Sequence, residues 1–378
     1  MKLELVATCL FGLEHLLGEE IDALGYERIS TINGRVTFLG DEEAVALSNT
    51  FLRFAERVYI KVGQSFHAES FEELFEGVRA LPWSKFIDRN GAFPVSGHSI
   101  RSALHSIPDC QAIIKKAICR SLEPVYGITV FPEDGVKYKV EFFILKDEAT
   151  LMIDTSGDPL HKRGYRYEAG TAPIRETLAA AIVKTSRPRE EVTLWDPMCG
   201  SGTIAIEAAM MMRNVAPGMK RRFIAETFPF IPERVWIDAR EEAHDVITPS
   251  EFTAFASDID ESVLEIAKGN AYRAGVLNSL RIFKQDARRI GAKDRRVTIV
   301  TNPPYGERLG TVEEVESLYR EIGAHFRSLA PWQAYIITSH EGFERLYGRR
   351  ADNVKKLYNG MIPCYLYQYY KNPKKGDR

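Results

Sequence analysis

The run Asn302-Pro303-Pro304-Tyr305 contains the residues whose types and spacing point most directly to chemistry. It follows an apolar stretch that we expect to be a buried strand, and a turn there does not need two prolines. The prolines fix the backbone and leave its carbonyls without competing local amide donors. The Asn302 side-chain oxygen and the Pro303 carbonyl can then both accept hydrogens from one exocyclic amine, while Tyr305 offers a ring for stacking a base, worth ~1–3 kcal/mol. We therefore predict that all four residues have a catalytic role, and we favour this over the alternative that they form only a structural turn.

A second chemical feature lies at residues 194–208, where an apolar approach meets Asp196, a glycine turn and the start of a helix. Gly200, Gly202 and Ala205 fit a dinucleotide-type spacing, which is a weak signal alone. Asp196 is more informative, because a carboxylate repels a pyrophosphate but suits a ligand with an ammonium group. S-adenosylmethionine carries both an ammonium and a sulfonium. A strand–turn–helix without a ligand also fits this stretch. The residues expected to bind the cofactor here are Asp196, Cys199, Gly200, Ser201, Gly202 and Thr203.

Two later strands are also expected to end in acids. Asp258 can accept both ribose hydroxyl hydrogens, and Ile259 beside it offers an apolar face to adenine. Asp260 is expected to cap the following helix, although both acids could be caps. Asp286 is placed to accept from the adenine amine, next to Ala287. Together with Asn302, these residues complete the predicted cofactor site.

The elements that must position these motifs alternate between strand and helix, which is typical of a doubly wound sheet. The expected strands are 192–196, 252–256, 280–284, 297–300, 333–338 and a hairpin over 354–370 that turns at Asn359-Gly360. The expected helices include 177–184, 204–212 and 312–329. An insertion over 211–250 separates the glycine loop from the next strand. We expect this domain to span 159–378.

The first part of the chain has the pattern of smaller α+β units. One, expected over 1–65, contains a strand, a helix ending at Gly25, a hairpin at Asn33-Gly34, a helix and a strand. The other, over 66–158, contains helices at 71–81 and 113–122 and strands at 93–96, 136–145 and 149–154.

Basic residues gather around the second helix of this unit and in the loop at 160–166. They form either a solvated helix face or a surface that neutralises RNA phosphates. The predicted RNA contacts are Arg101, Lys115, Lys116, Arg120, Arg163 and Arg166.

Composition limits the class of protein. A chain of 378 residues exceeds one ordinary core, so two or three domains are expected. Lys and Arg total 50 against 52 Asp and Glu, so any nucleic-acid surface must be local. Five scattered cysteines without a C-x-x-C pair argue for a reducing compartment and against a zinc site. With no long apolar run and an early polar start, we expect a cytoplasmic protein without metal or membrane contact.

Residues 96–118, beginning Ser96-Gly-His-Ser-Ile-Arg, are similar to the motif of THUMP domains, which bind RNA in RNA-modifying enzymes. The four strand-end motifs, in this order, resemble class I S-adenosylmethionine-dependent amino-methyltransferases. With Ala7-Thr-Cys-Leu-Phe-Gly-Leu-Glu and Lys356-Leu-Tyr-Asn-Gly-Met-Ile-Pro-Cys, nearly the whole chain resembles the THUMP-containing RNA guanine-N2 methyltransferases.

This resemblance implies a Rossmann-like, seven-stranded class I methyltransferase domain with a reversed last strand, preceded by an α+β ferredoxin-like and THUMP region. It implies S-adenosylmethionine as cofactor and RNA as partner, with large-subunit ribosomal RNA favoured and a tRNA-acting branch nearby. The second methyltransferase domain that some ribosomal members carry is missing from this sequence.

The expected mechanism flips the target base out of its stack, at a cost of a few kcal/mol. Alignment of the amine then contributes up to ~7–11 kcal/mol, and no general base is assigned. Three alternatives stay open. One is an adenine-N6 methyltransferase acting on DNA or RNA. Another is a non-catalytic RNA-binding assembly factor. The last, a nicotinamide dehydrogenase, is disfavoured by Asp196.

Overall fold

The computed structural model describes residues 1–166, 174–291, 296–304, 311–329 and 331–370. Its first half is built on an eight-stranded sheet in the order β2-β3-β1-β4-β8-β7-β6, with β5 paired to β8. The strands are β1 Leu3–Cys9, β2 Arg28–Ile32, β3 Arg35–Gly40, β4 Ala55–Lys61, β5 Phe66–His67, β6 Val95–Ile100, β7 Val140–Leu145 and β8 Glu148–Asp154. The helices are α1 Glu14–Ala23, α2 Glu42–Phe51, α3 Phe71–Arg79 and α4 Ile107–Tyr126.

Local sequence signals explain where these elements begin and turn. Gly34 has a φ of +76° between β2 and β3, as the Asn-Gly pair predicts for a tight hairpin. The Asp41 carboxylate accepts from the Ala44 amide at 3.0 Å and caps α2. Ser70 and Glu73 form a capping box at the start of α3. The strand expected over 93–96 begins two residues later, at Val95, and continues to Ile100.

The two expected N-terminal units share one sheet. Strand β4 pairs antiparallel with β8, with Tyr59 opposite Asp154. Beside this junction the Asn49 side chain donates to the Thr155 hydroxyl at 2.8 Å and accepts from the Ser156 hydroxyl at 2.6 Å. A sheet that is continuous across the junction couples the two units mechanically, so the boundary near residue 65 divides one rigid layer.

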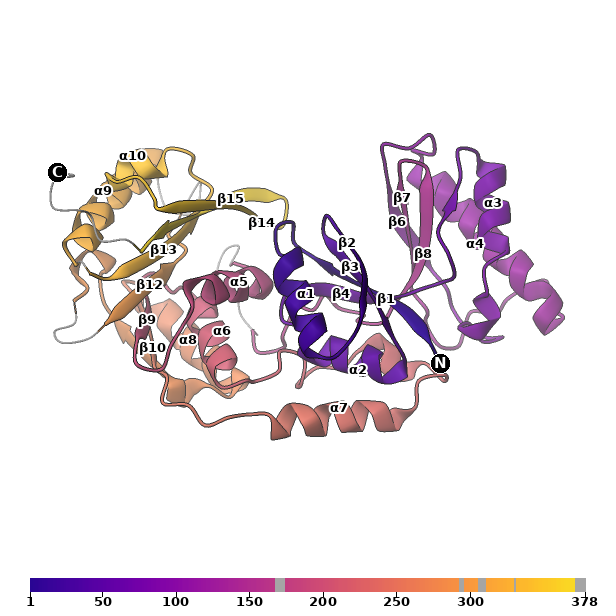
Figure 1. Cartoon of the computed structure of the whole chain (residues 1–378), viewed down its shortest axis with the longest axis horizontal. Coiled ribbons are helices and arrows are strands. Elements are labelled where there is room, and N and C mark those ends of the chain that lie inside the picture. Colours follow the sequence, from indigo (N-terminus) through magenta and orange to yellow (C-terminus); the bar gives the residue numbers. More distant parts are fainter. Residues whose placement is uncertain (167–173, 292–295, 305–310, 330, 371–378) are drawn as a thin grey trace.

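The second half forms a seven-stranded sheet in the order β11-β10-β9-β12-β13-β15-β14, in which β15 runs antiparallel to β13 (Figure 1). This confirms the predicted Rossmann-like sheet with a reversed strand. Its strands are β9 Thr193–Asp196, β10 Ala254–Asp258, β11 Leu280–Lys284, β12 Val297–Thr301, β13 Gln333–Thr338, β14 Asn353–Asn359 and β15 Ile362–Tyr369. Its helices are α5 Glu176–Ser186, α6 Thr203–Met212, α8 Glu261–Ala274, α9 Val312–Ser328 and α10 Phe343–Tyr347.

Alternate residues of this sheet enter two different hydrophobic cores. Leu194 of β9 and Val300 of β12 pack with buried residues of α5, α6 and α8. Their neighbours Trp195 and Ile299 pack on the opposite face with α9 and α10. Because successive side chains of a strand point to opposite faces, continuous apolar strands bury both faces of the sheet under helices.

The insertion expected over 211–250 connects the two halves. It contains helix α7, Glu233–Asp245, which packs along α2 at the lower side of the molecule (Figure 1). The Gly218 amide donates to the Thr50 carbonyl at 2.9 Å, and the Arg53 guanidinium donates to the Val215 carbonyl at 2.7 Å. A Cβ on Gly218 would lie 2.5 Å from the Asn49 carbonyl oxygen, so only glycine allows this close approach.

Among the described residues, no helix combines the length and apolarity needed to cross a membrane.

Candidate functional site

A pocket of about 410 Å³ lies at the carboxyl ends of β9, β10 and β12, and we call it the carboxyl-edge pocket. Parallel strands in a doubly wound sheet place their ligand sites at this edge. Most predicted cofactor residues line it, namely Asp196, Cys199, Gly200, Ser201, Thr203, Asp258, Ile259, Asp286, Ala287 and Asn302. The tertiary structure therefore brings together motifs that are separated by up to a hundred residues in the chain. Their individual roles in binding stay predictions.

Asp196 is the most unusual group in the pocket. Its side chain is 1% exposed at the end of β9, where it accepts from the Thr301 hydroxyl at 2.7 Å and from the Met198 amide at 3.3 Å. Burial raises the pKa of Asp196 to about 7, and the nearby Asp258 carboxylate adds to this effect. No cation of the described residues pairs with it. A buried carboxylate of this kind gains most from a cationic ligand.

The glycine loop is held against the neighbouring strand by its own backbone. The Gly200 amide donates to the Asp258 carboxylate at 3.0 Å, and the Cys199 amide donates to the Ser257 carbonyl at 3.0 Å. Gly202, which is not part of the pocket lining, has a φ of +83° at the start of α6. These bonds keep the loop open toward the pocket, with the helix N-terminus directed at it.

At the end of β10, the structure agrees in part with the roles predicted for Asp258 and Asp260. The Asp260 carboxylate accepts from the Ser262 amide at 2.9 Å and caps α8, which confirms the expected cap. Asp258 accepts from the Asp260 amide at 3.1 Å as well as from Gly200, and it remains part of the pocket wall. Ile259 is 60% exposed and presents an apolar surface there.

At the third strand end, Asp286 already has a cationic partner. The Arg288 guanidinium donates to both carboxylate oxygens, with the Nη2–Oδ2 distance at 2.6 Å. This hydrogen-bonded pair lowers the pKa of Asp286. A carboxylate can accept further hydrogens while it is bound to Arg288. A hydrogen bond from an adenine amine to Asp286 therefore stays a prediction.

The run that begins at Asn302, which is predicted to be catalytic, follows β12 directly. Asn302 and Pro304 line the pocket, whereas Pro303 is buried behind them. The hydroxyl of Tyr319, a fully buried residue of α9, donates to the Pro304 carbonyl at 2.7 Å. Tyr305 lies outside the described residues, so its predicted stacking role stays a prediction.

Tyr319 was not predicted to belong to the site. Its hydroxyl is also 2.9 Å from the Thr338 hydroxyl at the end of β13, so it connects two strand ends. Sequence contained a signal for it, because Tyr319 lies on the apolar stripe of α9 with Val315 and Ile322. A tyrosine on a buried helix face needs a partner for its hydroxyl.

One predicted RNA contact, Arg163, is wrong because its side chain is buried, and a second, Arg166, already has partners inside the protein. Arg163 has a side chain that is 1% exposed, and it donates to the carbonyls of Leu160 and Arg53 beside the Glu207 carboxylate. Arg166 donates to the Ile174 carbonyl and, at 2.7 Å, to the Thr203 hydroxyl of the cofactor loop. Both guanidiniums therefore form hydrogen bonds within the protein, although Lys162 and Gly164 of the same loop are exposed.

The four other predicted RNA contacts differ in how free their charges are. Arg101 and Lys116 are exposed. Lys115 is bound to Glu133 at 2.6 Å, with its ammonium over the Phe93 ring. Arg120 is exposed but paired with Glu123 of the same helix. Their contact with RNA stays a prediction.

Among the described residues, no group of three or more His, Cys, Asp or Glu side chains is arranged to hold a metal ion.

Family comparisons divide the chain into three matched segments. Residues 4–59 match an RlmL ferredoxin-like domain, and residues 68–154 match a THUMP domain. Residues 163–368 match the family described as the RMKL-like methyltransferase domain, which covers more than half of the chain.

Individual relatives resemble the chain over nearly its whole length. YpsC of Bacillus subtilis, provisionally named an RNA methyltransferase, is 44% identical over 98% of this chain and 96% of the relative. The ribosomal RNA large subunit methyltransferase K/L of Psychromonas ingrahamii is 34% identical over 96% of this chain but only 50% of the relative. The chain thus spans about half the length of that K/L relative.

One solved structure adds information on the ligand. SMU.472, provisionally named a methyltransferase and solved in complex with SAH, superposes with a TM-score of 0.90 at 40% identity. The match covers 99% of both chains.

Proposed function

Because the chain belongs to the RMKL-like methyltransferase family, we propose that it methylates the exocyclic N2 amine of a guanine in large-subunit ribosomal RNA. The family establishes the coarser statement, a THUMP-containing, S-adenosylmethionine-dependent RNA methyltransferase. The base, its atom and the RNA are the proposal.

The observation that carries the proposal is that Asp196 and Asn302 line the same pocket. Asp196 is a buried carboxylate without a cationic partner among the described residues, which fits the ammonium group of the cofactor. Ile259 can contact the apolar face of adenine, and the Asp258 carboxylate can accept hydrogen bonds from the ribose hydroxyls. When bound, the cofactor supplies a methyl group activated by its sulfonium.

The chain's own residues then act on the amine. The Asn302 side-chain oxygen and the Pro303 carbonyl accept its two hydrogens, which draws the nitrogen lone pair out of conjugation with the ring. The Tyr319 hydroxyl holds the next carbonyl, that of Pro304, and so limits movement of the motif. The methylated amine loses its extra proton to solvent. Catalysis by alignment of this kind needs a rigid acceptor pair.

Several observations favour RNA and, within RNA, the large ribosomal subunit. The THUMP segment at 68–154 carries the exposed Arg101 and Lys116, whose charges suit phosphate contacts. The K/L relatives are named for large-subunit ribosomal RNA. Both bases present an exocyclic amine to the same acceptors, so the choice of guanine over adenine rests on the resemblance of the motifs to guanine-N2 enzymes.

The direct test is nucleoside analysis of large-subunit ribosomal RNA, taken from cells that lack this gene and incubated with the protein and labelled cofactor. We expect the label in N2-methylguanosine. Label found only in N6-methyladenosine contradicts the choice of base, and label only in tRNA contradicts the choice of substrate.

Asn302→Ala tests the site itself. Loss of one acceptor should lower the methylation rate by about 10²–10³-fold, as for removal of one preorganised hydrogen-bonding group. Binding of SAH and RNA should persist. Asn278→Ala, an exposed asparagine elsewhere in the same domain, is the matched control. Full activity of Asn302→Ala would instead favour a non-catalytic RNA-binding factor.

A further inference from the structure

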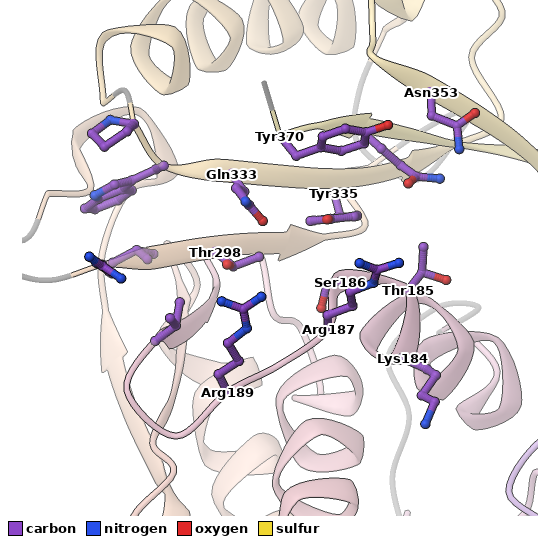
Figure 2. Close-up of a pocket in the computed structure, with 16 residues that line it drawn as sticks. Lys184, Thr185, Ser186, Arg187, Arg189, Thr298, Gln333, Tyr335, Asn353 and Tyr370 are labelled. Carbon is purple, nitrogen blue, oxygen red and sulfur yellow. The ribbon is translucent and has the colours of Figure 1, made fainter. Parts of the chain in front are cut away.

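A second pocket, of about 840 Å³, lies at the opposite edge of the same sheet. It is formed at the amino ends of β12 and β13, below the last residues of β15, and beside the end of α5 (Figure 2). We call it the amino-edge pocket. Three residues of β12, Ile299, Val300 and Thr301, lie between the lining residue Thr298 and Asn302, a distance of about 13 Å at ~3.3 Å per residue. It is therefore a separate site from the one that holds the methyl-transfer motif.

The charge of this pocket is uniformly positive. Its lining contains four basic side chains, Lys184, Arg187, Arg189 and Arg296, and no carboxylate. All four residues are exposed, and none forms an ion pair within the part of the chain that the structure describes. The whole chain has a net charge of −2, so this concentration of cations departs from the average surface. Other basic side chains in this domain, such as Arg288 and Arg320, are paired with acids.

Neutral hydrogen-bonding groups form the floor between these cations. Thr298 is 8% exposed, Tyr335 5% and Gln368 6%. All three line the cavity, and their side chains have no hydrogen-bond partner within the described residues. Burial raises the pKa of Tyr335, while Arg187 and Arg189 act to lower it, which places both guanidiniums close to the phenol. Figure 2 shows Arg187 and Arg189 directed toward the strand ends that carry Thr298 and Tyr335.

We propose that the amino-edge pocket binds phosphate groups of the RNA substrate, as a second contact remote from the methylated base. This proposal rests on the proposed function, because it takes the substrate to be RNA. Guanidinium groups bind phosphate oxygens in a bidentate manner, and a cavity without carboxylates does not repel them. Tyr370, which is 39% exposed at the rim, adds a ring on which an unpaired base can stack.

The separation of the two pockets gives the proposal a specific consequence. A short RNA that fills only the carboxyl-edge pocket cannot reach the amino edge, whereas a long structured RNA can contact both. The amino-edge pocket should therefore contribute to binding of large-subunit ribosomal RNA and not to binding of a minimal fragment.

The test is the double variant Arg187→Gln/Arg189→Gln, compared with Arg234→Gln/Lys268→Gln. The control removes two exposed charges that are paired with acids on α7 and α8. Affinity for a large-subunit ribosomal RNA transcript is measured between 50 and 300 mM salt, over which the Debye length falls from about 14 Å to about 6 Å.

We expect the amino-edge variant to bind the transcript about tenfold more weakly at low salt. The slope of log K against log salt should fall by about 1.4–1.8, which corresponds to two lost phosphate contacts. The control should change affinity by less than about twofold. Both variants should bind SAH, and a guanine-containing dinucleotide that is too short to span the two pockets, as the unmodified protein does.

Three outcomes overturn the proposal. If the two double variants have the same RNA affinity and salt dependence, the four cations are only a solvated surface. An equal loss of affinity for long and short RNA makes the effect non-specific. Competition by ATP or tripolyphosphate, with RNA affinity unchanged in the variant, assigns the pocket to a free phosphate compound. Failure of the proposed function is distinguishable, because it appears as absent methylation of RNA by the unmodified protein.

Discussion

The two edges of the C-terminal sheet carry pockets of opposite character. The carboxyl-edge pocket is smaller, at about 410 Å³, and contains three carboxylates, of which Asp196 is fully buried. The amino-edge pocket is about 840 Å³ and contains four basic side chains. The larger cavity is therefore not the one that the predicted cofactor residues line. Chemical composition, rather than size, distinguishes the pocket proposed for a cationic cofactor from the pocket proposed for a polyanion.

The same helix contributes to both pockets. Helix α5 begins beside Ile174, which lines the carboxyl-edge pocket, and ends at Ser186 in the amino-edge pocket. A helix C-terminus favours nearby cations, in keeping with Lys184 and Arg187 at this end. Strand carboxyl ends, by contrast, lead into loops and helix N-termini, where Asp258 and Asp260 accept backbone amides. The direction of the chain thus helps to set the charge of each edge.

The largest effect on cofactor affinity is expected from removing the one buried charge of the carboxyl edge. Asp196→Asn keeps the acceptor for Thr301 and Met198 but loses the attraction for an ammonium. We expect SAH affinity to fall by about 30–150-fold, or about 2–3 kcal/mol. Calorimetry measures it, with Asp260→Asn as control, because asparagine also caps helices. An unchanged affinity would show that Asp196 is only structural.

A smaller effect is expected from pH. Burial raises the pKa of Asp196 to about 7, so the carboxylate is largely protonated below that pH when no ligand is bound. SAH should bind about tenfold more weakly at pH 6 than at pH 8. The Asp196→Asn variant should lose this dependence. A native binding curve that is flat between these pH values would contradict the assignment.

The stability of the ligand-free protein should change in the opposite direction. Asp196 has a higher pKa in the native state than in the unfolded chain, where it is near 4. The native state therefore binds more protons between these values, and the free energy of unfolding should decline as pH rises from about 4 to about 7. Asp196→Asn should remove this part of the decline, which denaturant titration can measure.

The smallest effect is expected from removing the hydrogen bond that the Tyr319 hydroxyl donates to Pro304. Tyr319→Phe removes the hydrogen bond to the Pro304 carbonyl and should lower kcat about five- to tenfold, or about 1–1.5 kcal/mol. SAH affinity should stay within twofold, because Tyr319 does not line the pocket. Tyr347→Phe, at a buried tyrosine of the same core, is the control. Equal losses in both variants would indicate general destabilisation.

Much of the fold could be predicted because the apolar periodicity and turn residues are local. Strands β11 and β13 have the expected bounds, and Asp260 caps its helix as expected. The site could be predicted as a set of strand ends for the same reason. The roles of Arg163 and Arg166 could not, because their sequence is typical of a basic surface loop. The fold instead directs these two guanidiniums inward, toward the Glu207 carboxylate and the Thr203 hydroxyl of α6.

By itself, the sequence determined the order of the strands and helices and the four acidic or amide-bearing strand ends. It did so because these depend on residue type and spacing over a few positions. Only the tertiary structure decided which charges are free. Burial of Asp196, the contact of Tyr319 with Pro304 and the gathering of Lys184 and Arg296 in one cavity all join residues that are far apart in the chain. Charge pairing and desolvation depend on such neighbours, and no local pattern specifies them.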